Sequence, residues 1–171
     1  MNIGLFFGTF NPVHIGHMAI AGYMSEFTEL EQVWFVLTPH NPLKEKKGLL
    51  SDHHRLALLR VAVENNSRRL KVSDVELKLS QPSYTIHTLV HLEERYPGNT
   101  FSLIMGSDNL EHFHKWKNYE EILARYDLYI YPRNKPYEGQ FKDHPRIHFT
   151  NAPLMEISST FIRNAIKAKR I

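Results

Sequence analysis

Two histidines close to the start of the chain have a spacing suited to chemistry. His14 and His17 lie in the segment GTFNPVHIGH, which begins at Gly8. Residues three apart in a helix share one face, so the two imidazoles are expected to point in the same direction. A helix start also carries a positive partial charge. These features predict an anion site, with a phosphate or a ribose as its natural ligand.

The residues beside the histidines are typical of a strand that turns into a helix. The apolar run at residues 3–7 predicts the strand. Asn11 can cap the helix and Pro12 suits its first turn, so we expect the helix to begin there. Gly16 costs a helix interior roughly 1 kcal/mol relative to alanine, which indicates that something approaches the backbone closely at this point. Junctions of this kind bind nucleotides in α/β proteins.

A second candidate anion site lies near the other end of the chain. Ser159, Thr160 and Arg163 open a predicted helix. Ser159 and Arg163 are four residues apart and share a face, so a hydroxyl and a guanidinium can address one phosphate together. On its own, however, this pattern is more typical of an ordinary capped helix with a surface arginine.

The elements that must position these residues alternate along the chain. The predicted strands lie at 3–7, 33–37, 70–75, 101–105, 128–131 and 147–149. The predicted helices lie at 14–25, 52–64, 84–95 and 159–168, with an irregular pair over 108–125. This order predicts an α/β fold, a Rossmann-like open and mostly parallel sheet with helices on both faces. Two long loops are expected, at 39–51 and 132–145.

The composition limits the class of protein. The 171 residues fit one domain over residues 1–171 with a single core. Cysteine is absent, which removes thiolate nucleophiles and any disulfide argument for secretion, so a cytoplasmic location is expected. No apolar run approaches the length of a membrane span. The net charge of +3 is explained equally well by phosphorylated small molecules, so we expect neither nucleic acid nor membrane as a partner.

Together, the two ends of the chain resemble the nucleotidyltransferase superfamily of adenylyl- and cytidylyltransferases. The matching patterns are a GTFxPxHxGH turn after the first strand and ISSTxxR at the last helix. Further segments occur in order between them: PSYT at 82–85, MGSDNL at 105–110, and Trp116 followed by YEEIL at 119–123. With these segments the chain resembles the bacterial nicotinate-nucleotide adenylyltransferases over most of its length. The resemblance implies the same Rossmann-like fold.

The resemblance also implies an activity, the transfer of the adenylyl group of ATP to nicotinate mononucleotide with release of pyrophosphate, in NAD biosynthesis. No covalent intermediate forms in that family, so catalysis reduces to alignment and charge stabilisation. The catalytic residues it implies are His14, His17, Lys44 and Arg163. The ATP-binding residues it implies are Gly8, Thr9, Phe10, Gly16, Gly106, Asp108, Ser159 and Thr160. Mg²⁺ is expected on the ATP phosphates, with no metal site of the protein's own.

The second substrate is assigned to other segments. The residues implied for nicotinate mononucleotide are Asn41, Ser83, Tyr84, Thr85 and Trp116. The segment 83–85 opens a predicted helix, whose free N–H groups favour a carboxylate, so the acid nicotinate is expected in preference to the neutral nicotinamide. Trp116 could stack on the pyridine ring, although such a residue is as often part of the core. Asp108 has an alternative role as the N-cap of a helix over 110–113.

The chain departs from the common family pattern at three positions. Phe7 replaces a glycine, Asn11 an aspartate, and Leu43 a histidine before Lys44. The last change leaves the phosphate contacts of that loop open. His87 and His91, four residues apart, could mimic a zinc pair, but no third ligand is evident. The oligomeric state is open, and a homo-oligomer is compatible with the sequence.

Other functions remain alternatives at this point. A phosphopantetheine adenylyltransferase usually has threonine in place of His14, and a cytidylyltransferase is disfavoured by the loop at 106–108. A nicotinamide-nucleotide adenylyltransferase would prefer the amide. Class I aminoacyl-tRNA synthetases share the HIGH string, but this chain has no KMSKS-like loop. A non-catalytic nucleotide- or RNA-binding module would bind adenylate without releasing pyrophosphate.

Overall fold

The computed structural model describes residues 1–39, 48–154 and 158–168. Six strands form one open sheet in which each pair of neighbours is parallel. They are β1 (Asn2–Gly8), β2 (Gln32–Leu37), β3 (Leu70–Ser73), β4 (Thr100–Gly106), β5 (Leu128–Tyr131) and β6 (Ile147–Phe149). The order across the sheet is β3-β2-β1-β4-β5-β6, so the direction of winding changes between β1 and β4. Open α/β sheets bind ligands at this switch point, beyond the carboxyl ends of the strands.

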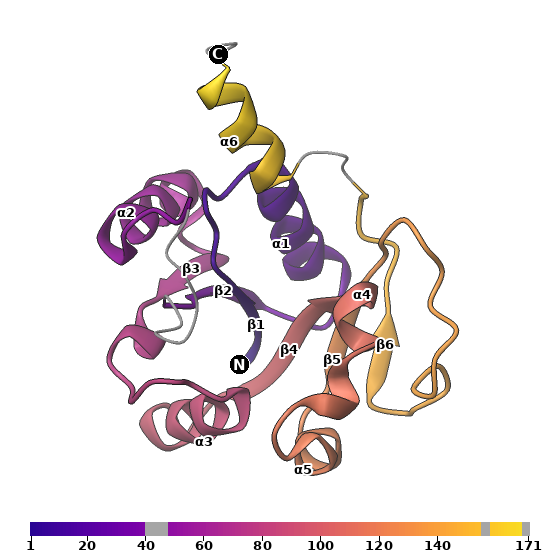
Figure 1. The fold of residues 1–171 in the computed structure, drawn as a ribbon. Coiled ribbons are helices and arrows are strands. Elements are labelled where there is room, and N and C mark those ends of the chain that lie inside the picture. The colour runs from indigo at the N-terminus through magenta and orange to yellow at the C-terminus, as the bar shows by residue number, and fades with distance from the viewer. Residues whose placement is uncertain (40–47, 155–157, 169–171) are drawn as a thin grey trace.

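Helices cover both faces of the sheet (Figure 1). On one face α1 (Ile15–Phe27) and α2 (Asp52–Val63) pack against buried strand residues that include Phe6 and Phe35. On the other face α3 (Thr85–Arg95), α4 (Ser107–Leu110) and α5 (Tyr119–Arg125) pack against Leu5 and Leu103. Successive strand residues point to opposite faces, which is why β1 contributes to both cores. The predicted fold is confirmed, with a sheet that is parallel throughout.

The last helix, α6 (Ser159–Lys167), is placed differently from the others. It projects from the body of the molecule beyond the start of α1 (Figure 1) and contains no fully buried residue. Phe161 and Ile166 on this helix are both more than half exposed. The helix therefore contributes little to either core.

The remaining elements are short, and the predicted boundaries agree closely with the structure. The described residues include the 3₁₀ helices η1 (Glu64–Asn66), η2 (Val75–Leu77) and η3 (Phe113–Lys115). The predicted irregular pair over 108–125 consists of α4, η3 and α5. The third strand ends at Ser73, two residues before the predicted end, because the chain turns toward η2 there.

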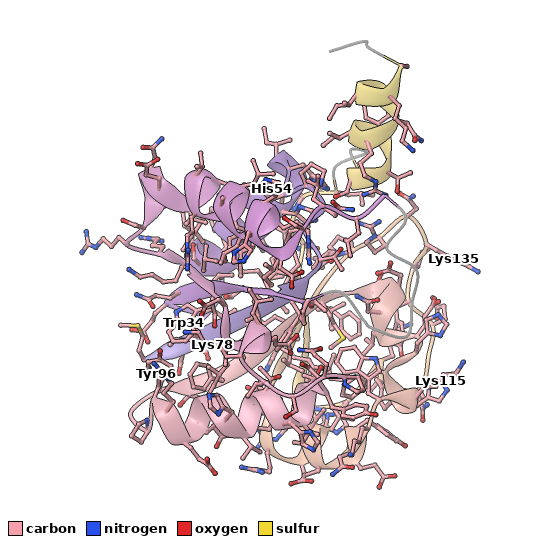
Figure 2. The ribbon with its side chains drawn as sticks, turned by 60° about the vertical axis from the view of Figure 1, so that its left-hand side comes forward. Trp34, His54, Lys78, Tyr96, Lys115 and Lys135 are labelled. Atoms are coloured by element: carbon pink, nitrogen blue, oxygen red, sulfur yellow. The ribbon has the colours of Figure 1, made fainter. Side chains whose placement is uncertain are left out.

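Aromatic side chains close the core away from the carboxyl ends of the strands. The ring of Trp34 in β2 makes edge contacts with Tyr96 and Phe101, at centroid distances of 5.2 and 5.6 Å. Figure 2 shows Trp34 and Tyr96 on one side of the molecule and Lys135, from the loop after β5, on the other. The end of α3 is thus packed against the sheet, which fixes the direction from which its first residues approach the switch point.

Candidate active site

The two histidines at the start of α1 stack on each other. Their ring centroids are 3.7 Å apart and the ring planes are inclined by 24°. Nδ1 of His14 accepts a hydrogen bond from the N–H of Gly16 (3.0 Å), and Nδ1 of His17 accepts one from the N–H of His14 (3.1 Å). A neutral imidazole that accepts at Nδ1 carries its proton on Nε2. The backbone at the helix start therefore makes an N–H donor of each ring.

This geometry corrects one prediction. Asn11 does not cap α1, because His14 is the N-cap residue and its ring accepts from the first turn. The side chain of Asn11 is instead bound to Gly48 and Leu50, in the segment before α2. Asn11 and Pro12, joined by a cis peptide bond, precede the helix.

Burial keeps both histidines in the neutral form. It lowers the pKa of His17 to about 3, with smaller contributions from His14 and Arg133. The pKa of His14 is also lowered, by burial first and by Arg133 second. Burial is therefore the largest cause of both shifts. Neutral imidazoles at physiological pH stabilise negative charge by donating hydrogen bonds, without changing their own charge.

The turn before the histidines is packed into the core. The Phe10 side chain is 3% exposed and its ring contacts the ring of His17 at a centroid distance of 5.0 Å. Phe10 has a φ of 45°, a left-handed conformation that a bulky residue adopts only where its surroundings hold it. A Cβ atom on Gly8 would lie 2.9 Å from the same ring, so only glycine leaves room for it. Thr9, between them, is exposed.

A cavity of about 190 Å³ opens beside the histidines. Its walls come from three regions distant in sequence: the start of α1, the end of β5, and the start of α6. From α1 it is lined by Gly16 and by the two histidines, and from α6 by Ser159. The donors of the histidine pair therefore lie at a cavity wall, as expected for an anion site.

Two residues of this cavity, Tyr131 and Arg133, are not among those predicted from the sequence. Burial raises the pKa of Tyr131 to about 12. Arg133 Nε lies 3.8 Å from Asp108 Oδ2, so a cation and a carboxylate share this side of the site. Tyr131 is the last residue of β5, and Arg133 follows the carboxyl end of that strand. The rule that led to the segments after β1 and β4 could therefore have found them.

The segment after β4 lies next to the turn because β4 pairs with β1. Gly106 ends β4 and is the N-cap of α4, so Asp108 lies within the first turn of this helix. The alternative prediction that Asp108 caps a helix over 110–113 is therefore wrong. A Cβ atom on Gly106 would meet Asp108 Oδ1 at 2.5 Å and the Tyr131 ring at 2.9 Å. The absence of a side chain at Gly106 allows Asp108 and the Tyr131 ring to lie close to its backbone.

The start of α6 is bonded to the turn near the beginning of the chain. Ser159 Oγ donates to the carbonyl oxygen of Pro12 (2.8 Å), and the Arg163 guanidinium donates to that of Asn11 (2.5 Å). Arg163 also donates to Thr160 Oγ1 (3.1 Å). The structure thus brings together the two ends of the chain that carry the predicted ATP residues. Ser159 Oγ and the Arg163 guanidinium donate to backbone carbonyl oxygens of the turn in this structure.

Three residues predicted for the second substrate, Ser83, Tyr84 and Thr85, lie at the start of α3. This helix begins at Thr85 with Tyr84 as its N-cap residue, and no described side chain caps it. Ser83 Oγ is buried with no hydrogen-bond partner among the described residues. Lys117 Nζ lies 4.6 Å from the centroid of the Tyr84 ring. The helix start and the segment after η3 are therefore in contact.

Trp116 belongs partly to the core. It is half-buried, and its ring makes an edge contact with Phe113 at 5.0 Å. Asn41, Leu43 and Lys44 lie outside the described residues. Within residues 1–39, 48–154 and 158–168, no three His, Asp or Glu residues form a group that could hold a metal ion. Over the same residues, no helix has the length and apolar character needed to cross a bilayer.

The chain is similar to proteins of known name. The family described as cytidylyltransferase-like matches residues 5–165. A Flavobacterium johnsoniae protein is 56% identical and aligns over 98% of this chain and 87% of its own length. One from Flavobacterium psychrophilum is 55% identical, over 99% and 89%. Both are named "Probable nicotinate-nucleotide adenylyltransferase".

Solved structures share the fold. Plasmodium falciparum nicotinic acid mononucleotide adenylyltransferase complexed with NaAD superposes with a TM-score of 0.76, at 22% identity. The same protein complexed with APC gives a TM-score of 0.75. Each match covers 95% of this chain and 82% of the other. The open parallel sheet and its helices are therefore common to these proteins.

Proposed function

The chain belongs to the nicotinate-nucleotide adenylyltransferases of the cytidylyltransferase-like family, and from this premise we propose how its site joins ATP to nicotinate mononucleotide. A phosphate oxygen of the mononucleotide forms a bond to the α-phosphorus of ATP. The bond from that phosphorus to the oxygen bridging to the β-phosphate breaks, and pyrophosphate leaves. The other product is nicotinate adenine dinucleotide, a step in NAD biosynthesis.

The observation that carries this mechanism is the stacked pair of neutral histidines. Each Nδ1 accepts from the backbone, so each ring keeps an Nε2–H donor at the cavity wall. The attacking phosphate is already anionic, so it needs no base. What the reaction requires is alignment and stabilisation of negative charge on the α-phosphate and the leaving group, and fixed donors supply both.

The remaining ATP contacts are assigned to residues that line the cavity or follow in sequence the elements around it. Gly106 and Asp108 serve the adenosine half, and Arg133 adds a positive charge on the same side. Ser159, Thr160 and Arg163 hold the departing pyrophosphate. A guanidinium has five N–H donors, so Arg163 can keep its bond to Asn11 and still donate to a phosphate. Lys44, which lies between β2 and α2 in the sequence, completes the set as a third cation.

Nicotinate is bound at the start of α3, with Trp116 beside its ring. The first turn of α3 contains no acidic residue, and the ammonium of Lys117 lies over the Tyr84 ring. A helix start and a nearby cation both favour an anion. These charges support a preference for nicotinate, which carries a carboxylate, over the neutral nicotinamide. Asn41 is assigned to the same substrate.

Mg²⁺ accompanies ATP in this proposal, and when bound it supplies charge neutralisation on the phosphates. The Asp108 carboxylate is exposed and faces Arg133. The site therefore fits an ion that arrives already bound to the nucleotide. A single domain over residues 1–171, a cytoplasmic location and a homo-oligomer stay predictions.

Measuring pyrophosphate release tests the function. The protein is incubated with ATP, Mg²⁺ and, in parallel, nicotinate mononucleotide, nicotinamide mononucleotide or phosphopantetheine. We expect the rate of pyrophosphate release to be highest with nicotinate mononucleotide. No release with any acceptor would overturn the function, and faster reaction of nicotinamide mononucleotide would overturn the role of the α3 start.

A further inference from the structure

A buried arginine on α2 connects the turn before α1 with the described segments on either side of residues 40–47. Arg55 has no exposed surface, and it donates from Nε to the carbonyl oxygen of Leu50 (3.0 Å). One terminal nitrogen donates to the carbonyl oxygens of Thr9 (2.7 Å) and Thr38 (2.8 Å), and the other to Asp52. Thr9 belongs to the turn before α1. Thr38 and Leu50 stand in the sequence on either side of residues 40–47, which include Asn41 and Lys44.

The guanidinium is suited to this connection by its shape. Its donors are held in one plane at fixed angles, so three carbonyl oxygens bound to it keep a fixed spacing. A lysine ammonium has three donors on a flexible stem and does not reproduce that spacing. Arg55 therefore fixes the distance between the turn and both neighbouring segments.

Asn11 makes a second connection between the same segments. Its side chain is 6% exposed, donates through Nδ2 to the carbonyl oxygen of Gly48 (2.8 Å), and accepts at Oδ1 from the N–H of Leu50 (3.1 Å). An aspartate at this position would still accept from Leu50, but a carboxylate cannot donate to Gly48. The amide is thus the form of this side chain that satisfies both partners.

We propose that Asn11 and Arg55 are positioning residues, which hold the ATP-binding turn and the segment 48–50 in one register for the transfer. The substrates in this statement rest on the proposed function. Neither side chain is placed at the reacting atoms. A displacement of about 1 Å between reacting groups is enough to lower a rate by about a hundredfold, so a fixed register matters to turnover.

The two residues differ in what their loss leaves in place. Without the Asn11 side chain, the turn is still bound through the Thr9, Asn11 and Pro12 carbonyls to Arg55, Arg163 and Ser159. Asn11→Ala should therefore lower kcat by about tenfold and leave the KM for ATP within about twofold, because the turn keeps its other bonds while its register against the segment 48–50 is lost. Asn11→Asp, which keeps the bond from Leu50, should fall between Asn11→Ala and the wild type.

Arg55→Lys changes contacts to the turn as well as to the two flanking segments. We expect it to raise both KM values and to lower kcat by about tenfold. Arg60→Lys is the matched control, because Arg60 lies on the same helix with an exposed side chain. Asn66→Ala is the control for Asn11→Ala, since Asn66 is exposed in η1.

Hydrogen exchange tests the connection without any substrate. In the wild type the Leu50 amide is bonded to Asn11, so peptides containing residues 48–51 should exchange faster in Asn11→Ala. In Asn11→Asp they should exchange nearly as slowly as in the wild type. Because this readout needs no turnover, it judges the connection even if the wild type releases no pyrophosphate, a result that counts only against the proposed function.

Three results would overturn the proposal. The first is unchanged exchange of residues 48–51 in Asn11→Ala. The second is kinetic constants for Asn11→Ala that match those of Asn66→Ala. The third is a lower melting temperature of Asn11→Ala with kcat and both KM values unchanged, because that pattern describes a residue that only stabilises the fold.

Discussion

The turn between β1 and α1 and the start of α6 reach the same cavity but are supported in opposite ways. In the turn, Phe10 and Asn11 are buried, and the Asn11 side chain is hydrogen-bonded to Gly48 and Leu50. In α6 no residue is fully buried, and the helix is attached by polar contacts of Ser159 and Arg163. The geometry of the turn is therefore a property of the core, whereas that of α6 depends on a few hydrogen bonds. Substitutions in the two regions should separate effects on stability from effects on turnover.

The largest expected effect is on turnover, at His17 in the turn. His17→Ala removes a fixed donor at the cavity wall, so kcat should fall by at least about a hundredfold. The measurement is the initial rate of pyrophosphate release at saturating substrates, with circular dichroism to show that the fold is intact. A folded variant with near-normal turnover would remove His17 from the mechanism.

Two phenylalanines test the difference in support directly. Phe10 is 3% exposed, so Phe10→Ala should lower the free energy of unfolding by about 3 kcal/mol. Phe161 on α6 is 63% exposed, and Phe161→Ala should change it by no more than about 0.5 kcal/mol. Urea denaturation of both variants measures these values. Similar losses in the two would show that α6 is as much a part of the core as the turn.

Arg163 should show the reverse pattern, a loss of turnover without a loss of stability. Arg163→Ala removes the guanidinium from the turn and from the proposed pyrophosphate site, so we expect kcat to fall by about tenfold. Its urea midpoint should stay close to that of the wild type because the side chain packs in neither core. Arg163→Lys, which keeps the charge but loses the fork, should recover part of the rate. A clear drop of the midpoint would contradict the account of α6.

A further effect concerns acid, and it belongs to the turn. The folded protein holds the pKa of His17 at about 3, below the ordinary value of 6.5, because the ring is buried. Between these values the unfolded chain binds the proton more readily, so stability is lost as the pH falls through this window. His17→Asn should therefore lose less stability between about pH 7 and about pH 4 than the wild type, as measured by urea denaturation. An equal loss in both proteins would contradict a buried neutral His17.

The parts of the site that follow local rules were predictable from the sequence. The spacing of His14 and His17 places them on one helix face, and the structure shows their rings stacked. The alternation of strands and helices predicts the open sheet, and the resemblance assigns both ends of the chain to one nucleotide. Ser159 is indeed bonded to Pro12, 147 residues away in sequence.

The parts that depend on distant partners were not predictable in the same way. Asparagine is a residue type that often caps helices. The side chain of Asn11 is instead hydrogen-bonded to Gly48 and Leu50, which are 37 and 39 residues away in sequence. His14 takes the cap instead, which no capping preference for small polar residues would suggest. The position of Arg133 after β5 follows the general rule for open α/β sheets, but its pairing with Asp108 depends on the folded sheet.

The stereochemical course at the α-phosphorus tests the central claim most directly. If the turn aligns the two substrates for a direct in-line transfer, with no protein nucleophile, the phosphorus should invert its configuration once. The measurement uses ATP made chiral at the α-phosphorus by sulfur substitution, with ³¹P NMR of the dinucleotide product. Inversion is the predicted result. Retention would require two displacements through a covalent enzyme intermediate and would contradict the account.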